Sequence, residues 1–432
     1  MLVNPLAQEI NSIIEQENPN LLSAMSRLGK ALYFPKGILS QAAEASKKAN
    51  KFNATIGIAT EKGGPMHLTV IQETLTAYKP SDLYPYAPPT GKPALRQAWK
   101  EKMLKENPSL ACKKIGLPIV TNALTHGLSI AADLFVDEGD PLILPDKQWD
   151  NYDLTFTVRR GAQSIHFPLY AEDGAFNVAG MSEALLSQKK HGKAILLLNF
   201  PINPTGYTPS DEDGNAIVAA ITEAAESGMT VVVICDDAYF GLFFEESLTE
   251  SLFGRLANIH PRIIPIKVDG ATKENYVWGF RVGFITFASD SDLLLEALEK
   301  KTMSCIRSSI SSSPHPSQSF ILRALESPDI DAQLDEKRNI LKRRANRVKV
   351  LLNNDRFDDA WTYYPFNSGY FMCLKLIDGN AEQLRLHLLD HYGVGTIAIG
   401  KTDLRIAFSC IEEDGLEELF NLIYQAVHDL RK

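Results

Sequence analysis

The feature that most constrains the fold of this chain is an alternation of short apolar runs with helical segments between residues 90 and 300. A run that is apolar throughout is typical of a strand covered on both faces, as in a parallel sheet between two layers of helices. Helical spacing of apolar residues is clear in the segment that Pro93 opens. We therefore expect an α/β fold with a mainly parallel sheet between helix layers. The predicted strands are 141–144, 194–198, 230–235, 263–268 and 283–287.

The sequence changes character after about Ser317. A long, highly charged helical segment over 335–352 precedes strand-like runs at 369–376 and 404–408, and a closing helix has one apolar face. A chain of 432 residues also exceeds what one hydrophobic core usually supports. We therefore predict a large domain and a smaller α+β domain. The predicted boundaries are 65–316 for the large domain, and 1–64 with 317–432 for the small one.

Composition excludes several kinds of partner. The net charge of −9 argues against a nucleic-acid partner or an anionic membrane surface, because both need a basic excess. No apolar run approaches the roughly 20 residues that span a bilayer, and the N-terminus lacks the pattern of a secretory signal. The five cysteines are scattered and odd in number, which predicts buried thiols in a reducing compartment. We therefore expect a soluble, cytoplasmic protein.

Polar residues directly after apolar runs are candidates for a ligand site, because open parallel sheets bind ligands at the carboxyl ends of their strands. Two such segments are the Asn-Pro-Thr-Gly turn at 203–206 and the Asp-Asp-Ala-Tyr segment at 236–239. Each has a simpler interpretation: the first as an ordinary turn, and the second as a helix cap that Asp236 provides.

Two further segments have the same placement. Lys273, with Gly279 and Arg281 behind it, follows the predicted strand at 263–268. A single lysine is usually a solvated surface group. Residues 123–127 begin a predicted helix, where free backbone amides can bind phosphate, although every helix start has such amides.

Together and in this order, the four segments resemble the fold-type I pyridoxal-phosphate aminotransferases of class I/II, over nearly the whole chain. The family pattern of lysine, five residues, glycine, one residue and arginine is met by Lys273, Gly279 and Arg281. The segments 203–206 and 236–239 match two more family elements. The resemblance implies a seven-stranded sheet in the large domain, pyridoxal 5′-phosphate as cofactor, and transfer of an amino group from an L-amino acid to a 2-oxo acid.

The resemblance also implies roles around the cofactor ring. Lys273 would form a Schiff base with the cofactor aldehyde, and its freed amine would then move the substrate proton. Asp236 would keep the pyridine nitrogen protonated, which makes the ring an electron sink. Asn203 and Tyr239 would donate hydrogen bonds to the 3-oxygen of the ring. Lys273, Asp236 and Tyr239 are therefore the predicted catalytic residues.

The phosphate would be bound by Arg281 and by the backbone amides of Ala123, Leu124 and Thr125. Trp149 matches the family's aromatic residue that stacks on the cofactor, and its simpler interpretation is a core tryptophan. The closest members carry a serine three residues before the lysine, where this chain has Gly270. One phosphate contact is therefore expected to be missing or replaced.

Substrate and partner residues follow from the same resemblance. Arg405, in an apolar strand, matches the family arginine that binds the α-carboxylate; otherwise it is a solvated arginine. Gly57 lies in a loop expected near the substrate. Tyr86 matches the tyrosine that reaches the phosphate of a neighbouring subunit, which implies a homodimer. Arg307 either crosses that interface to bind a side-chain carboxylate, which favours aspartate and 2-oxoglutarate, or is a loop arginine without a ligand.

Other kinds of protein fit less well. A lyase or decarboxylase on the same fold stays open, because such enzymes keep the cofactor residues and change the substrate groups. A ligand-sensing regulator would carry a basic DNA-binding segment before Tyr86, and no such segment is present. His387 and His391 have helical spacing but no third ligand at a recognisable distance, so we predict no metal.

Overall fold

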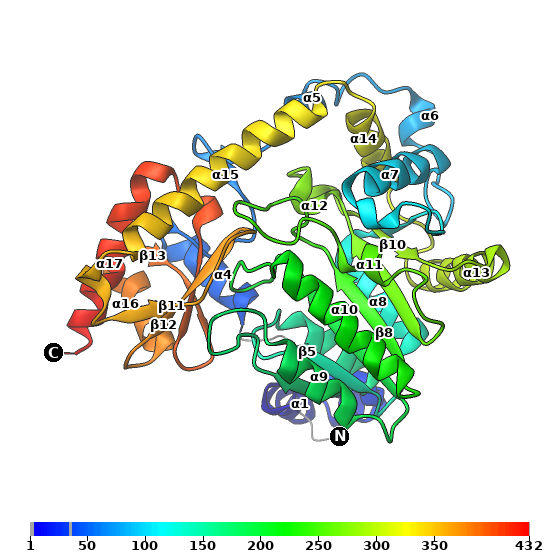
Figure 1. Ribbon diagram of the computed structural model, residues 1–432. Helices are drawn as coiled ribbons and strands as arrows, with labels where there is room; N and C mark the ends of the chain where they lie inside the picture. The colour runs from blue at the N-terminus through cyan, green and yellow to red at the C-terminus, as the bar shows by residue number, and fades with distance from the viewer. Residues whose placement is uncertain (1–3, 34–36, 432) are drawn as a thin grey trace.

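The computed structural model describes residues 4–33 and 37–431, and its largest element is a seven-stranded sheet (Figure 1). All neighbouring strands run parallel except those that pair with β10, which is antiparallel to β4 and to β9. The mixed α/β fold with a mainly parallel sheet is therefore confirmed. In spatial order the strands are β4 (Ile119–Asn122), β10 (Val282–Phe287), β9 (Ile263–Asp269), β8 (Thr230–Asp236), β7 (Lys193–Asn199), β5 (Pro141–Pro145) and β6 (Gln163–Phe167).

Three details of this sheet differ from the sequence prediction. The strands β4 and β6 were not predicted; β6 is an edge strand whose residues are mostly exposed or half-buried, so it lacks an apolar run. The predicted strand at 283–287 does form, but it runs antiparallel to its neighbours. The connection 270–281 holds only the four-residue helix α12 (Ala271–Glu274) and a 3-10 turn, without the long helix that usually crosses between parallel strands.

Alternate residues of the central strands enter two separate cores, which explains their continuous apolarity. On β7, Ile195 and Leu197 pack in the core that contains Leu128 of α8 (Ala123–Phe135). Their neighbours Leu196 and Leu198 pack in the other core, with helices α9 (Val178–Ser187) and α10 (Asp211–Glu226). Figure 1 shows α9 and α10 together on one face of the sheet. The sheet is thus covered on both faces, as expected from its apolar strands.

A second, antiparallel sheet lies apart from the first, and the long helix α15 (Ile330–Leu352) runs from near α5 to this part of the molecule, where it packs against α17 (Figure 1). The predicted charged helix is α15; the predicted run at 369–376 contains β12, and the predicted run at 404–408 overlaps β15, which begins one residue earlier. Early residues join this part of the chain, because β1 (Phe52–Asn53) pairs with β13 (Val394–Gly395). The strands, in order, are β11 (Trp361–Tyr363), β12 (Phe371–Leu376), β15 (Asp403–Ala407) and β14 (Ile397–Ile399); the helices are α4 (Ile38–Lys48), α15 (Ile330–Leu352), α16 (Ala381–Tyr392) and α17 (Leu416–Asp429).

The remaining elements connect these parts or lie at their surface. Of the first three helices, α2 and α3 are short, and both pack against α1. The further elements are α1 (Pro5–Glu17), α2 (Pro19–Ala24), α3 (Arg27–Ala31), β2 (Thr60–Glu61), β3 (Gly64–Pro65), α5 (Thr69–Gln72), α6 (Pro80–Leu83), α7 (Pro93–Glu106), α11 (Leu252–Leu256), α12 (Ala271–Glu274), α13 (Asp292–Ser309) and α14 (His315–Leu325).

The cysteines differ from the expectation of buried thiols. All are free, but only Cys235 and Cys373 are buried, and Cys112 is exposed on a surface turn. Within the described ranges, no helix combines the length and apolarity needed to cross a membrane.

Candidate active site

The carboxyl ends of β7, β8 and β9 meet the amino end of α8 at two adjoining cavities. Their volumes are about 450 Å³ and about 210 Å³, and the side chain of Lys273 lines both. Ligands of open parallel sheets bind at this edge. The residues that line both cavities are Ile38, Leu124, Thr125, Trp149 and Lys273.

Lys273 lies in the short helix α12, four residues after the end of β9. Its ammonium nitrogen is 4.9 Å from the centre of the Tyr239 ring. The hydroxyl of Tyr370 donates a hydrogen bond of 3.1 Å to the Lys273 carbonyl, which fixes the backbone of the turn. Removal of water from the amine, helped by the positive charge of Arg281, lowers the pKa of Lys273 to about 8 against the pull of Asp236.

Asp236 ends β8 and is buried, with its carboxylate in the smaller cavity. Tyr152 donates a hydrogen bond of 2.7 Å to its Oδ2, and the amide of Ala238 donates one of 3.2 Å to its Oδ1. Burial raises the pKa of Asp236 to about 6, although the Tyr152 hydroxyl and the Lys273 charge both oppose that shift. The Asn199 side chain holds the strand end by a hydrogen bond of 2.7 Å to the Asp236 carbonyl.

Tyr152 and Asn199 are site residues that the sequence analysis missed. Each carried a weak signal: Tyr152 lies three residues after Trp149, and Asn199 directly follows the predicted strand 194–198. Their partners are far away in the sequence, so only the folded chain brings them to Asp236.

Arg405 is buried at 1% exposure on β15, and this contradicts its interpretation as a solvated arginine. Its guanidinium donates hydrogen bonds to Oδ1 of Asn203 at 3.0 Å and to the Thr55 carbonyl at 2.8 Å. The guanidinium carbon also lies 4.2 Å from the centre of the Phe371 ring. No carboxylate in 4–33 or 37–431 forms an ion pair with Arg405, and its Nε has no partner there. A buried cation without a counter-ion suits an anionic ligand.

The start of α8 and Arg281 form the polar end of the larger cavity. Ala123, Leu124, Thr125 and Arg281 all line it. The Ala123 amide donates to the Arg281 carbonyl at 3.2 Å, which joins the two segments. Thr272 also lines this cavity, and its buried hydroxyl has no hydrogen-bond partner among the described residues. A helix start, a guanidinium and a free hydroxyl fit a phosphate group.

Gly270 has no room for the serine that the resemblance leads one to expect. A Cβ at this position would lie 2.6 Å from the Val282 carbonyl oxygen and 2.7 Å from the Gly283 Cα. Both are backbone atoms, which cannot move aside cheaply. Position 270 therefore offers no side-chain contact to a phosphate, whereas Thr272, two positions later, has a hydroxyl without a partner in the described part of the chain.

Trp149 and Gly57 both lie at the cavities. The ring of Trp149 packs edge-on against Tyr152 at a centroid distance of 5.5 Å and lines both cavities, so it is not simply a core residue. Gly57 lines the smaller cavity, where a Cβ would lie 3.6 Å from the Phe371 ring and 3.9 Å from the Tyr239 hydroxyl.

Tyr86 and Arg307 do not join this site within one chain. Tyr86 is 93% exposed, and both residues line a third cavity, of about 370 Å³. Arg307 lies in the last turn of α13 rather than in a loop, and it donates a hydrogen bond to the Ser311 hydroxyl.

A parallel sheet that brings a desolvated lysine amine, a buried carboxylate and a phosphate-binding helix start to one pair of cavities defines the class of fold-type I pyridoxal-phosphate proteins. Within that class, the chain belongs to the aminotransferase class I and II family, whose sequence model matches residues 18–423. The cofactor of this family is pyridoxal 5′-phosphate. The free Thr272 hydroxyl and the unpaired Arg405 cation fit the anionic groups of the cofactor and of an amino acid, respectively.

Curated relatives are distant. A probable aspartate/prephenate aminotransferase of Aquifex aeolicus is 25% identical over 267 residues, which are 60% of this chain and 61% of that protein. A probable N-acetyl-LL-diaminopimelate aminotransferase of Bacillus subtilis is 23% identical over 364 residues, covering 81% of this chain and 82% of that protein. The chain thus spans about three fifths of the length of the first of these relatives.

Solved structures are similar over a larger part of the chain. An aminotransferase of Anaerococcus prevotii has a TM-score of 0.81 at 23% identity, covering 94% of this chain and 99% of that one. A mutant aspartate aminotransferase of Thermus thermophilus has a TM-score of 0.76 at 20% identity, covering 93% of this chain and 99% of that one. At these identities the likeness establishes the fold, which is fold type I.

Proposed function

We propose that this protein is an aminotransferase that moves an amino group from an L-amino acid to a 2-oxo acid. The observation that carries the proposal is the convergence of the Lys273 amine, the Asp236 carboxylate and the unpaired Arg405 guanidinium on adjoining cavities. Transamination needs these three groups: a mobile base, a partner for the cofactor ring, and a site for the substrate carboxylate. Aminotransferase is also the activity that the names of the curated relatives give.

Each site residue then has a task that its environment supports. When bound, pyridoxal 5′-phosphate supplies a carbonyl carbon and an electron-withdrawing ring. Lys273 anchors the cofactor and then carries the proton removed from the substrate Cα, because a pKa near 8 leaves part of its amine unprotonated at neutral pH. Asp236 would pair with the ring nitrogen, and Tyr152 fixes the orientation of its carboxylate.

The remaining groups orient the ligands. Asn203 and Tyr239, which line the smaller cavity, would donate hydrogen bonds to the 3-oxygen of the ring, and Trp149 would stack on the ring. The amides of Leu124 and Thr125, with Arg281 and Thr272, would bind the phosphate, whereas the Ala123 amide already donates to the Arg281 carbonyl. The Thr272 hydroxyl would take the place of the serine that Gly270 excludes. Arg405 binds the α-carboxylate, held in place by Thr55 and Asn203.

For the substrate, we propose aspartate or an aromatic amino acid as donor and 2-oxoglutarate as acceptor. Relatives named as aspartate and aspartate/prephenate aminotransferases support this preference. Arg307 of a second copy of the chain would bind the distal carboxylate, and Tyr86 of that copy would reach the phosphate. The exposure of Tyr86 and Arg307 together at one surface cavity supports such a shared site in a homodimer.

The test is substitution of Lys273 by alanine. We expect loss of covalently attached cofactor and a fall in transamination of at least about a thousandfold, because the anchor and the proton carrier are the same amine. Visible absorbance of the bound cofactor and single-turnover conversion of the twenty amino acids are the two measurements. The exposed Lys190, replaced in the same way, is the matched control and should change neither.

Two outcomes would count against the proposal. Transamination retained by Lys273→Ala would remove Lys273 from its role. Release of carbon dioxide or a side-chain fragment from the wild-type protein, without formation of a 2-oxo acid, would favour the lyase alternative instead.

A further inference from the structure

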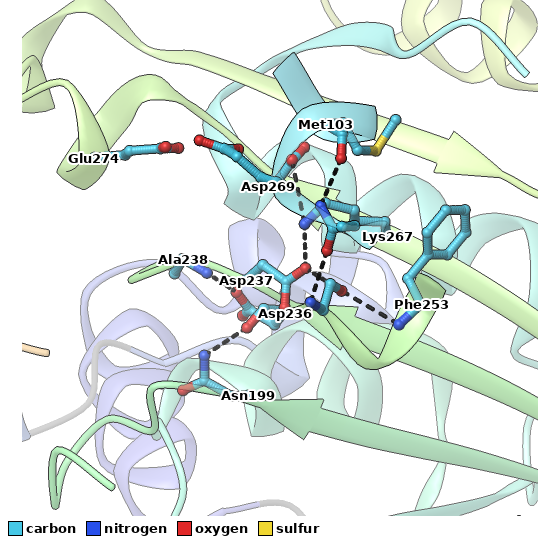
Figure 2. Close-up of polar contacts among 12 residues, drawn as sticks. Met103, Asn199, Asp236, Asp237, Ala238, Phe253, Lys267, Asp269 and Glu274 are labelled. Atoms are coloured by element: carbon cyan, nitrogen blue, oxygen red, sulfur yellow. Dashed lines mark hydrogen bonds and ion pairs between the residues drawn. The ribbon is translucent and has the colours of Figure 1, made fainter. Parts of the chain in front are cut away.

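A buried lysine lies behind the candidate site, on the side of β8 and β9 away from the cofactor cavities. Lys267, on β9, is 1% exposed and does not line either cavity. Figure 2 shows its ammonium between the carboxylates of Asp237 and Asp269. The ammonium also lies 4.7 Å from the centre of the Phe240 ring. Burying a lysine ammonium costs free energy of folding, so the groups that contact Lys267 must compensate for that cost.

The first carboxylate belongs to the residue next to Asp236. Successive residues at a strand end point to opposite faces, so Asp237 faces away from the cavities while Asp236 faces into them. Asp237 accepts a hydrogen bond of 2.6 Å from the Ser251 hydroxyl as well as the ion pair from Lys267. The Ser251 amide in turn donates to Asn107 at 2.7 Å. Asp237 therefore has one fixed orientation.

The second carboxylate belongs to the segment that leads to Lys273. Asp269 ends β9, four residues before Lys273, and accepts a hydrogen bond of 3.1 Å from the Trp99 indole and an ion pair of 3.3 Å from Lys267. The Trp99 ring stacks on Phe284 of β10 at 4.2 Å. Lys267 thus joins the end of β8, which carries Asp236, to the end of β9, which lies four residues before Lys273.

We propose that Lys267 is a positioning residue of the active site: it ties together the two strand ends that present Asp236 and Lys273, and its charge offsets the negative charge behind Asp236. The inference rests on the proposed function. Lys267, Asp237 and Asp269 together carry one net negative charge, and loss of the lysine would leave two buried carboxylates unopposed. Electrostatic repulsion at such short range is strong in a protein interior.

The titration behaviour of the groups supports this arrangement. Burial disfavours the charge on Lys267, but the carboxylates of Asp237 and Asp269 outweigh burial and raise its pKa, so the ion pair persists. After burial, which is the main cause, the negative charge of Asp237 contributes to the raised pKa of Asp236. Glu274, paired with Lys102, is a further buried acid close to Asp269.

The test is a pH titration of the visible absorbance of the cofactor-loaded protein, without substrate. Lys267→Met adds one net negative charge behind the site. That charge favours the protonated form of the cofactor-loaded site, so the midpoint of the titration should rise by about one pH unit. In Asp237→Asn, a negative charge is removed, and the midpoint should fall. The double variant Lys267→Met/Asp237→Asn has the wild-type net charge and should return towards the wild-type midpoint, as should Lys267→Arg.

A merely structural role predicts a different pattern. It would lower the unfolding temperature of all four variants without moving the midpoint in opposite directions, and that result would overturn the inference. If Lys267→Met does not fold, the titration midpoints of the other two variants still test the inference: the midpoint should fall in Asp237→Asn and return towards the wild-type value in the double variant. A wild-type protein that titrates normally but transfers no amino group would contradict the proposed function alone. The exposed Lys190→Met is the control that should leave the midpoint unchanged.

Discussion

At the scale of single residues, the site depends on how the protein changes the ionisation of two groups. Lys273 and Asp236 are oppositely charged in water at neutral pH, but removal of water draws the pKa of the lysine down to about 8 and that of the acid up to about 6. Both shifts move the groups closer to the pH at which an acid or base works best. The sequence identified both residues but could not give these values, because they arise from the surrounding packing.

The lowered pKa of Lys273 predicts how cofactor capture depends on pH. Only the unprotonated amine attacks the cofactor carbonyl, so the capture rate of cofactor-free protein should rise with pH and level off above a midpoint near 8. At pH 7 about one tenth of the amine is unprotonated. Stopped-flow absorbance after mixing with pyridoxal 5′-phosphate measures this rate.

Asp236→Asn provides the internal check. The carboxylate raises the pKa of Lys273, so its removal should shift the midpoint below 8. A midpoint above pH 10 in the wild-type protein would show that the amine behaves as an ordinary surface lysine.

At the scale of elements, the site requires β9, β10 and α8 to approach one another unusually closely. Gly270 directly follows β9 and lies against the backbone of β10, and Gly283 of β10 faces the start of α8. A Cβ at Gly283 would lie 2.6 Å from the Ala123 carbonyl carbon and 2.9 Å from the Leu124 amide. These glycines allow the proposed phosphate-binding amides and the Lys273 turn to share one cavity.

Substitution of Gly283 by alanine should therefore weaken the cofactor site. The added methyl group must push away the start of α8, at a cost of about 1–3 kcal/mol in the free energy of unfolding. We also expect a higher dissociation constant for pyridoxal 5′-phosphate, because the displaced amides belong to the proposed phosphate site. Chemical denaturation and fluorescence titration measure the two effects.

Gly279→Ala is the matched control, because no atom of residues 4–33 or 37–431 lies within 4 Å of a Cβ at that position. It should leave both quantities near their wild-type values. Equal behaviour of the Gly283 and Gly279 variants would show that the close approach is not needed.

At the scale of the whole molecule, one chain brings together most of the predicted site but not all of it. Tyr86 and Arg307 share a separate surface cavity, away from Lys273. In a symmetric dimer, a surface segment of each chain can complete the site of the other. The domain boundaries and the dimer stay predictions. The dimer can be tested because Arg307 of one subunit would act with Lys273 of the other.

Mixed dimers provide that test. Arg307→Ala should weaken 2-oxoglutarate as acceptor far more than pyruvate, because only 2-oxoglutarate has a distal carboxylate. Lys273→Ala subunits should be inactive with both acceptors. If Arg307 acts across the interface, random reassembly of equal amounts should restore about a quarter of wild-type activity with 2-oxoglutarate, because half of the dimers then hold one complete site.

Activity with 2-oxoglutarate that stays at the level of Arg307→Ala alone would place Arg307 outside the neighbouring site. Reassembly of wild-type with Lys273→Ala subunits, measured with pyruvate, controls for the efficiency of mixing.

The sequence by itself determined the features that depend on residues close together in the chain, namely most strands of the large sheet and the family motif around Lys273. Continuous apolarity predicted five of the seven strands of the large sheet, and the spacing of Lys273, Gly279 and Arg281 indicated the family. Only the tertiary structure decided which groups meet: Tyr152 with Asp236, 84 positions apart, and Arg405 with the Thr55 carbonyl, 350 apart. The antiparallel direction of β10 and the position of Lys267 between two carboxylates were likewise seen only in the tertiary structure. These contacts come from packing between distant elements, and no local pattern encodes them.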